Sequence, residues 1–273
     1  MAVNYPRTIQ QLFDQFATEE DCLRYLYEVR WGGSFKCSKC AGSSAWNIRR
    51  GCLRCVICHS DTSVTQGTVF ANTHIPLKLW FLAIWYMVSQ KHGISALGLS
   101  RALGVKRQKT GWQLMKKIRS GMIRPNRSRL SGLVEIDEIL IGKKRHKFEG
   151  RSPQGKTLVL VAAEDKGKKR IGRIRLQIIP DATSGSLRTA VSDLVEPGSV
   201  VRTDGWTSYA LEQWGYRHHR IRQRSLAPGE DPTPLVHLIS SLLKRWLLGT
   251  HQGGVQTTHL QEYLNEFVFR FNR

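Results

Sequence analysis

The stretch VEIDEILIG, residues 134–142, alternates apolar and acidic side chains at its start. Val134 and Ile136 have one parity, and Glu135 and Asp137 have the other. Because a β-strand points successive side chains to opposite faces, this alternation predicts a half-buried strand that carries carboxylates at its far end.

A second acid, Asp204, follows the strand-like run SVVRT and precedes Gly205. Taken alone, an Asp before a Gly is best explained as a turn residue. The chain, however, has a formal net charge of +21, with 42 Lys and Arg against 21 Asp and Glu. So basic a chain calls for a polyanion, either nucleic acid or an anionic membrane surface. We therefore interpret Asp137 and Asp204 as a metal-binding pair that cuts or joins nucleic acid.

The positive charge is concentrated in the first half of the 273 residues. Residues 31–130 contain seventeen Lys and Arg but one acid, Asp61. The N-terminus lacks a basic-then-apolar signal, and the apolar run at residues 75–88 is shorter than the roughly 20 residues of a membrane span. We expect a cytoplasmic, nucleoid-associated protein with no membrane partner, whose six cysteines are reduced or metal-bound.

Two C-x-x-C pairs predict a zinc ribbon, since two such knuckles brought together by a hairpin form a tetrahedral four-sulfur site. The zinc would be structural, because four protein ligands leave no open position for chemistry. Four unrelated buried thiols or a redox dithiol are the alternatives, and Cys52 or His59 could replace a ligand in a shifted register. The predicted ligands are Cys37, Cys40, Cys55 and Cys58.

Residues 94–103 and 106–118 predict two short helices around Gly104, which resemble a helix-turn-helix. Its second helix would enter the major groove of DNA while basic side chains grip phosphates. An ordinary helical hairpin with a solvated charged face is the alternative. The predicted DNA contacts are Lys106, Arg107, Lys109, Lys116, Lys117 and Arg119.

The second half predicts three strands, a helix, a strand ending at Asp204 and a helix at residues 206–214, with a basic hairpin tip at residues 142–156. This order is the layout of a ribonuclease H-like domain, whose first and fourth strands are neighbours. Their terminal carboxylates could then bridge two Mg²⁺ ions about 3.5–4 Å apart.

The predicted fold class is thus multidomain α+β, with a zinc ribbon and helix-turn-helix before a ribonuclease H-like catalytic domain. The expected divisions are N-terminal helices at 1–30, the zinc ribbon at 31–72, a helix-turn-helix region at 73–122, a linker at 123–130 and the catalytic domain at 131–273.

A further helix is predicted at residues 235–248, where His237, Ser241 and Lys244 share one face. We expect His237 to be a third metal ligand and Lys244 to hold phosphate.

The chain resembles the small insertion-sequence transposases that have an N-terminal zinc ribbon and a DDE-type catalytic domain, the ISXO2-like class. The resemblance covers nearly the whole chain and rests on the C-x-x-C ribbon, SVTQGTVF, IPLKLWFLAI, GISALGLSRALGV, VEIDEILIG, TDGW, SLLKRWLLGTHQG and LNEFVFRFNR. It implies two Mg²⁺ (or Mn²⁺) ions, binding to terminal inverted repeats, and strand cleavage followed by transfer to target double-stranded DNA. Pairing two transposon ends requires at least a homodimer.

In that family Asp137 and Asp204 match the first two acids, and Lys244 matches the Lys seven residues after the third ligand. The third ligand departs from the pattern, because the usual Asn and Glu positions hold Pro234 and His237. Glu230 and Asp231 are nearby substitutes. Two other functions remain open: a catalytically degenerate, sequence-specific DNA-binding protein, and an RNA-binding zinc protein, against which the placement of the acids argues.

Overall fold

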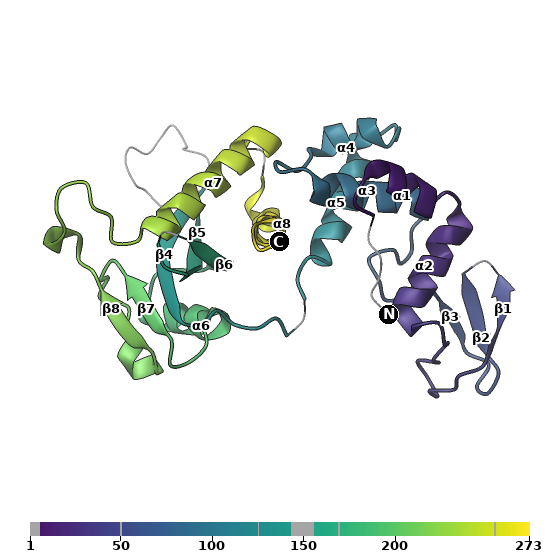
Figure 1. The fold of residues 1–273 in the computed structure, drawn as a ribbon, viewed down its shortest axis with the longest axis horizontal. Helices are drawn as coiled ribbons and strands as arrows, with labels where there is room; N and C mark the ends of the chain where they lie inside the picture. The colour runs from purple at the N-terminus through teal and green to yellow at the C-terminus, as the bar shows by residue number, and fades with distance from the viewer. Residues whose placement is uncertain (1–5, 50, 125, 143–155, 169, 254) are drawn as a thin grey trace. The chain divides into compact units, whose positions relative to one another are not determined.

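The computed structural model describes residues 6–273 apart from 50, 125, 143–155, 169 and 254. The chain forms two compact units, Met1–Gly121 and Met122–Arg273 (Figure 1). Among the described residues, no helix is long and apolar enough to cross a membrane.

Three helices of the first unit meet around an aromatic cluster. The Phe16 ring stacks on Phe81 with centroids 4.2 Å apart, and Tyr25 meets both rings edge-on. Thr18 begins the second helix with a capping box, as its hydroxyl accepts from the Asp21 N–H. The helices are α1 (Ile9–Gln15), α2 (Glu19–Trp31), α3 (Leu77–Ser89), α4 (Ala96–Ala102) and α5 (Gln108–Ser120).

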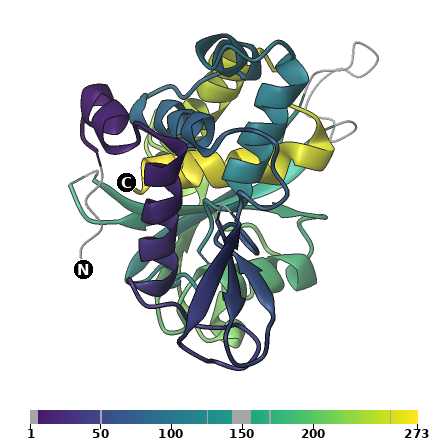
Figure 2. The same ribbon diagram turned by 90° about the vertical axis from the view of Figure 1, so that its right-hand side faces the viewer.

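A three-stranded antiparallel sheet, ordered β1-β2-β3, lies between α2 and α3 in the chain. Its strands are β1 (Ala45–Arg49), β2 (Cys52–Cys55) and β3 (Asp61–Ser63), seen beside α2 in Figure 2. Phe35, Cys37 and Cys55 form its small buried core, against which Tyr27 and Trp31 of α2 pack. So small a core is marginal without a further crosslink.

Helices α4 and α5 approach each other closely across the turn at Gly104, whose φ of +67° is the left-handed conformation that glycine adopts readily. A Cβ at Gly111 would lie 2.3 Å from Ser100 Oγ and 2.8 Å from the Ala96 carbonyl oxygen. Only glycine at position 111 therefore permits this helix pair.

The second unit is built on a five-stranded mixed sheet ordered β6-β5-β4-β7-β8. β4 pairs antiparallel with β5 and parallel with β7, so the predicted neighbourhood of the first and fourth strands is confirmed. The strands are β4 (Leu133–Ile141), β5 (Thr157–Asp165), β6 (Ile171–Ile179), β7 (Val200–Thr203) and β8 (Arg217–Arg220). The helices are α6 (Ser184–Leu194), α7 (Pro234–His251) and α8 (Leu260–Phe271), with 3₁₀ turns η1 (Leu211–Trp214), η2 (Gln223–Ser225) and η3 (Thr257–His259).

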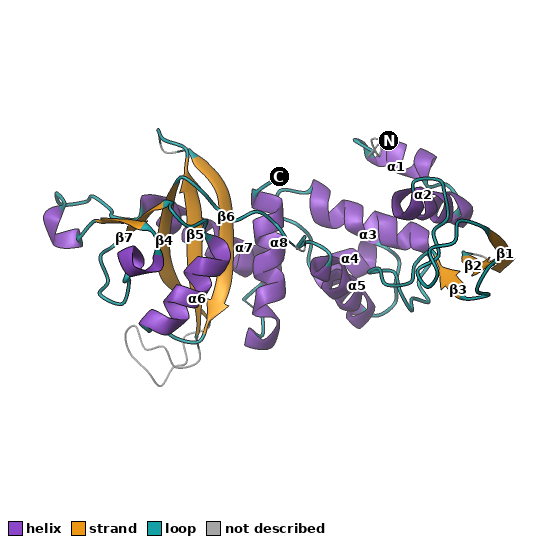
Figure 3. Ribbon diagram, turned by 90° about the horizontal axis from the view of Figure 1, so that it is seen from below, coloured by secondary structure: helices purple, strands orange, loops and turns teal. Residues whose placement is uncertain are grey.

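Helices cover both faces of this sheet (Figure 3): α6 packs on one face, and α7 and α8 pack on the other. The strand predicted at residues 134–142 is confirmed as β4, but the prediction that one of its faces is solvated is wrong. Val134 and Ile136 face α6, whereas Ile139 faces α7 and α8, and even Glu135 is fully buried.

The helix predicted at residues 206–214 is also wrong, since that segment holds only the 3₁₀ turn η1. Tyr209 is buried on the α6 side of the sheet and Trp214 packs there partly buried, whereas Trp206 is exposed. The basic hairpin tip predicted at 142–156 lies almost wholly outside the described residues.

Candidate functional site

The four predicted cysteine ligands converge at the ribbon. Their sulfur atoms all lie within 4.8 Å of one another, with Cys37 3.6 Å from Cys58 and Cys40 3.5 Å from Cys55. Tetrahedral zinc with bonds of about 2.3 Å needs sulfurs about 3.8 Å apart, so this set fits the ion. The prediction of a structural zinc site is confirmed.

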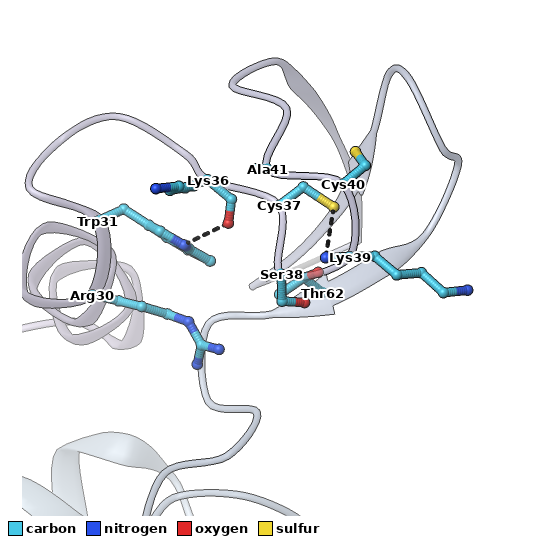
Figure 4. A pocket seen from close by; sticks show the side chains of 9 residues that line it. All are labelled: Arg30, Trp31, Lys36, Cys37, Ser38, Lys39, Cys40, Ala41 and Thr62. Atoms are coloured by element: carbon cyan, nitrogen blue, oxygen red, sulfur yellow. Dashed lines mark hydrogen bonds between the residues drawn. The ribbon is translucent and has the colours of Figure 1, made fainter.

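The polar surroundings of Cys37 and Cys58 lower the pKa of both thiols, whereas at Cys40 the backbone N–H of Gly42 lowers the pKa but Cys58 and Cys55 outweigh it and raise the pKa to about 12. The Ser60 hydroxyl lies 3.4 Å from Cys37 Sγ and lowers the pKa of that thiol to about 6. The Lys39 N–H donates to the same sulfur over 3.4 Å, as Figure 4 shows for the first knuckle. An open hollow of about 600 Å³ adjoins this knuckle, and Arg30 and Lys36 line it (Figure 4).

The other thiols lie apart from the zinc cluster. Cys52 is buried on β2, and Cys22 is buried on α2, where burial raises its pKa to about 12. His59 has a φ of +54° in the second knuckle and is not part of the group of ligands.

The parallel β4–β7 pairing places Asp137, in the middle of β4, beside the C-terminal end of β7, which Asp204 follows. In this parallel register Glu135 lies opposite Arg202, so Asp204 follows β7 at the level where Asp137 lies on β4. Adjacent strands are about 4.8 Å apart, and residues two positions apart share a face. Asp137 and Asp204 therefore lie on the α7 side of neighbouring strands.

Asp137 is half-buried, and Asp204 is exposed. Burial raises the pKa of Asp137, and the charge of Asp204 raises it further. The Asp137 carboxylate accepts from the Thr233 hydroxyl over 2.9 Å and from the Glu138 N–H over 2.7 Å. Asp204 also makes a turn, because its carboxylate accepts from the Trp206 N–H over 3.0 Å.

Glu135 is a buried carboxylate for which the sequence suggested no separate role. It holds the start of α7 against β4. Its Oε1 accepts from the Val236 N–H in the first turn of α7 over 2.8 Å, and its Oε2 lies 3.3 Å from Arg202 Nη1. An acid at a helix N-terminus is favoured by the unpaired N–H groups and the helix dipole. In the sequence, only its position two residues before Asp137 could have pointed to this structural role.

His237, on the first turns of α7, lies between two aspartates. Its Nε2 is 3.4 Å from Asp137 Oδ2, and its Nδ1 is 2.5 Å from Asp231 Oδ2. Because a carboxylate only accepts, the Asp231 contact places the Nδ1 proton and leaves Nε2 facing Asp137. Asp231 also accepts from the Thr233 N–H over 2.9 Å.

Glu138 and Tyr209 form a second pair that sequence reasoning missed. The Tyr209 hydroxyl donates to Glu138 Oε1, and the tyrosine is buried. Burial raises the pKa of Glu138 to about 7, and the charges of Asp137 and Asp204 add to this. Three carboxyl groups thus influence one another near the middle of β4.

Not all these donors are as tightly gathered as the cysteines. Among the described residues, the four cysteines are the one group of three or more His, Cys, Asp or Glu side chains with ligand atoms all within 4.8 Å. Asp137 and His237 are in contact, and the charge of Asp204 contributes to raising the pKa of Asp137. Lys244 and Ser241 lie exposed on the same helix as His237.

The predicted DNA contacts on α5 differ in exposure. Lys106, Arg107 and Lys109 are exposed at its N-terminal end. Lys117 donates to the Ala71 carbonyl over 2.9 Å. Arg119 is only 1% exposed, so its assignment as a phosphate contact is corrected: its guanidinium belongs to the interior of the first unit.

The remaining predicted contact, Lys116, is half-buried and lies over the Trp112 ring, with 5.5 Å from its nitrogen to the ring centroid. Its charge is therefore directed partly at its own helix.

Comparison with known proteins gives the family. Residues 17–61 match the family described as transposase zinc-ribbon domain, and residues 129–272 match the ISXO2-like transposase domain. An uncharacterized protein in transposable element ISH50 of Halobacterium salinarum is 27% identical over 282 residues, covering 93% of this chain and 91% of that protein. The catalytic core domain of BIV integrase is 18% identical with a TM-score of 0.33, covering 50% of this chain and 81% of that one. The match to the ISXO2-like transposase domain, over residues 129–272, spans more than half of this chain. The chain therefore belongs to the ISXO2-like transposase family.

Proposed function

We propose that this chain is a DNA transposase that binds the inverted-repeat ends of its element, cleaves them and transfers the strand to target DNA. The observation that best supports this is the parallel β4–β7 pairing, because Asp137 lies on β4 two residues after the last paired position and Asp204 follows β7. The net charge of +21 suits a DNA substrate, and such a protein would act in the cytoplasm at the nucleoid.

Asp137, Asp204 and His237 would hold divalent metal, with Mg²⁺ or Mn²⁺ as the expected ions. The chemistry of the donors fits, since carboxylate oxygens suit Mg²⁺ and Mn²⁺. Burial, and then the charge of Asp204, raise the pKa of Asp137, so a bound cation would stabilise its carboxylate form. When bound, the metal supplies Lewis-acid stabilisation of charge on the phosphate oxygens.

The protein's own residues prepare this site. Thr233 orients the Asp137 carboxylate, and Asp231 fixes which nitrogen of His237 faces it. Lys244, two turns along α7 from His237, would contact phosphate. Two copies of the chain would hold two DNA ends.

Helices α4 and α5 would form the helix-turn-helix of the first unit. Lys106, Arg107 and Lys109 supply its exposed positive charge at the helix end that enters the major groove in such motifs.

The Asp137→Asn variant tests the assignment. It keeps the size of the side chain but replaces one acceptor oxygen by an NH2 group and removes a charged metal ligand, so we expect nicking of inverted-repeat DNA to fall by at least roughly 100-fold in rate. The substrate is DNA carrying the repeats that flank the gene, incubated with Mg²⁺ or Mn²⁺, and DNA binding should remain.

Asp193→Asn, which makes the same change at an exposed position of α6, is the matched control and should cleave normally. Undiminished cleavage by Asp137→Asn would contradict the assignment. Binding without nicking by the unaltered protein, in either metal, would instead support a degenerate DNA-binding protein.

A further inference from the structure

The edge strand β8 and the residues after it carry several exposed arginines. The sequence RHHRIRQR, residues 217–224, contains four arginines and no acid. Among the described residues, no carboxylate oxygen forms an ion pair with any of the four, and each is exposed. They are Arg217, Arg220, Arg222 and Arg224.

Other arginines of the same unit are matched by acids. Arg173 pairs with Glu164, and Arg202 lies 3.3 Å from both Glu135 and Asp165. Unlike Arg173 and Arg202, the four arginines of residues 217–224 are exposed within eight residues of one another, so their positive charge is available to an external anion.

Two of these arginines lie beside the turn that carries Asp204. A Cβ built on Gly205 would be 2.8 Å from Arg220 Cγ and 3.1 Å from Arg222 Cγ. The Ile221 N–H donates to the Thr203 carbonyl over 3.0 Å, which holds this segment against the end of β7. Glycine at position 205, with a φ of +86°, leaves room for both side chains.

We propose that Arg220 and Arg222 bind the phosphodiester backbone next to Asp204, so that β8 and η2 guide one DNA strand to the catalytic carboxylates. This inference rests on the proposed function and adds a DNA contact on the catalytic unit itself. Guanidinium groups match phosphate oxygens in planar, two-pronged hydrogen bonds. The competing explanation is that the charges merely protect an exposed sheet edge from pairing with another chain.

The salt dependence of DNA binding separates these explanations, because each phosphate contact contributes about 0.9 to the slope of log K against log salt. The full-length, zinc-loaded protein is titrated into a fluorescent duplex of mixed sequence, without Mg²⁺ and without chelator. For Arg220→Ala/Arg222→Ala we expect the slope to fall by about 2 and affinity at 0.1 M salt to fall by roughly tenfold per arginine.

The matched control is Arg188→Ala, which removes one exposed arginine from α6 and should leave the slope unchanged. Arg220→Lys/Arg222→Lys keeps the charge and should retain most of the slope, and its thermal stability together with that of the alanine variant shows that both fold. An unchanged slope in the folded alanine variant, or an equal loss in the control, overturns the proposal.

Because this assay involves no cleavage, its outcome is independent of the Asp137→Asn experiment. If Arg220→Ala/Arg222→Ala reduces the slope while Asp137→Asn still cleaves, the arginine contact is supported and only the catalytic assignment is contradicted.

Discussion

His237 has contacts that a carboxylate could not reproduce in full. Its two nitrogens face two aspartates, Asp137 on β4 and Asp231 just before α7. A glutamate, the residue usual at this position in the family, would repel both. The contact with Asp231 thus gives a reason why an imidazole is accommodated at position 237, because the imidazole N–H donates to the Asp231 carboxylate.

This argument predicts an altered metal preference. Imidazole suits borderline ions better than Mg²⁺, so the unaltered protein should cleave faster with Mn²⁺ than with Mg²⁺. His237→Glu/Asp231→Asn, which exchanges the ligand and removes one repelling charge, should raise the Mg²⁺ to Mn²⁺ rate ratio by roughly tenfold, while His237→Ala should lose cleavage.

Initial nicking rates in each metal measure this ratio. Ser241→Glu adds a carboxylate one turn along α7 and should leave the ratio as it was. A ratio unaffected by the double substitution would show that His237 does not touch the metal.

At the scale of single residues, the sequence predicts the acids better than their surroundings. Asp137 and Asp204 could be proposed because Asp137 alternates with the apolar residues of one strand-like run and Asp204 follows another. Thr233, Glu138 and Tyr209 could not, because their contacts depend on how α7 and the turn after β7 pack on the sheet. The burial of Arg119 was not predictable for the same reason, because it depends on how the helices of the first unit pack around that side chain.

At the scale of elements, strand order was more predictable than burial. The sequence of strands and helices implied that β4 lies beside β7. Alternation in residues 134–137 suggested one solvated face, yet both faces are covered, and buried acids compensate by pairing. Glu135 meets Arg202, and Glu164 on β5 meets Arg173 on β6.

The Glu164–Arg173 pair predicts acid-sensitive stability. Burial alone would raise the pKa of Glu164, but hydrogen bonds from Arg173 outweigh it and hold the pKa at about 2, below the ordinary 4.5. A lowered folded-state pKa stabilises the fold above the ordinary pKa, and this contribution is lost as pH falls from about 4.5 to about 2.

We expect Glu164→Gln to lower the free energy of unfolding by roughly 2 kcal/mol at pH 7 and to flatten its dependence on pH in that acid range. Urea unfolding followed by circular dichroism at several pH values measures both effects. Glu196→Gln changes an exposed acid of the same unit and should behave as the unaltered protein; equal stability of the two variants at pH 7 would refute the role of the pair.

At the scale of the whole molecule, we expect two metals to have separate tasks in the two compact units. Zinc holds the ribbon, whose own core is a few side chains, whereas the second unit has apolar clusters on both faces of its sheet. Stability of the ribbon should therefore depend on zinc, and that of the catalytic unit should not.

Removal of zinc tests this division. We expect a chelator to open residues 33–66 to proteolysis while residues 133–141 and 234–251 stay protected, because only the ribbon loses its crosslink. Limited proteolysis with mass spectrometry locates the cuts, and added Zn²⁺, but not Mg²⁺, should restore protection. Equal loss of protection in both units would show that they do not fold separately.

The position of Glu135 has a consequence for how relatives can diverge. One carboxylate that never meets DNA ties the start of α7 to β4 and, through Arg202, to β7. A substitution there would displace three elements at once and alter turnover from inside the protein. Differences in transposition frequency between related elements can thus originate at an interior residue, out of reach of any inspection of the DNA-facing surface.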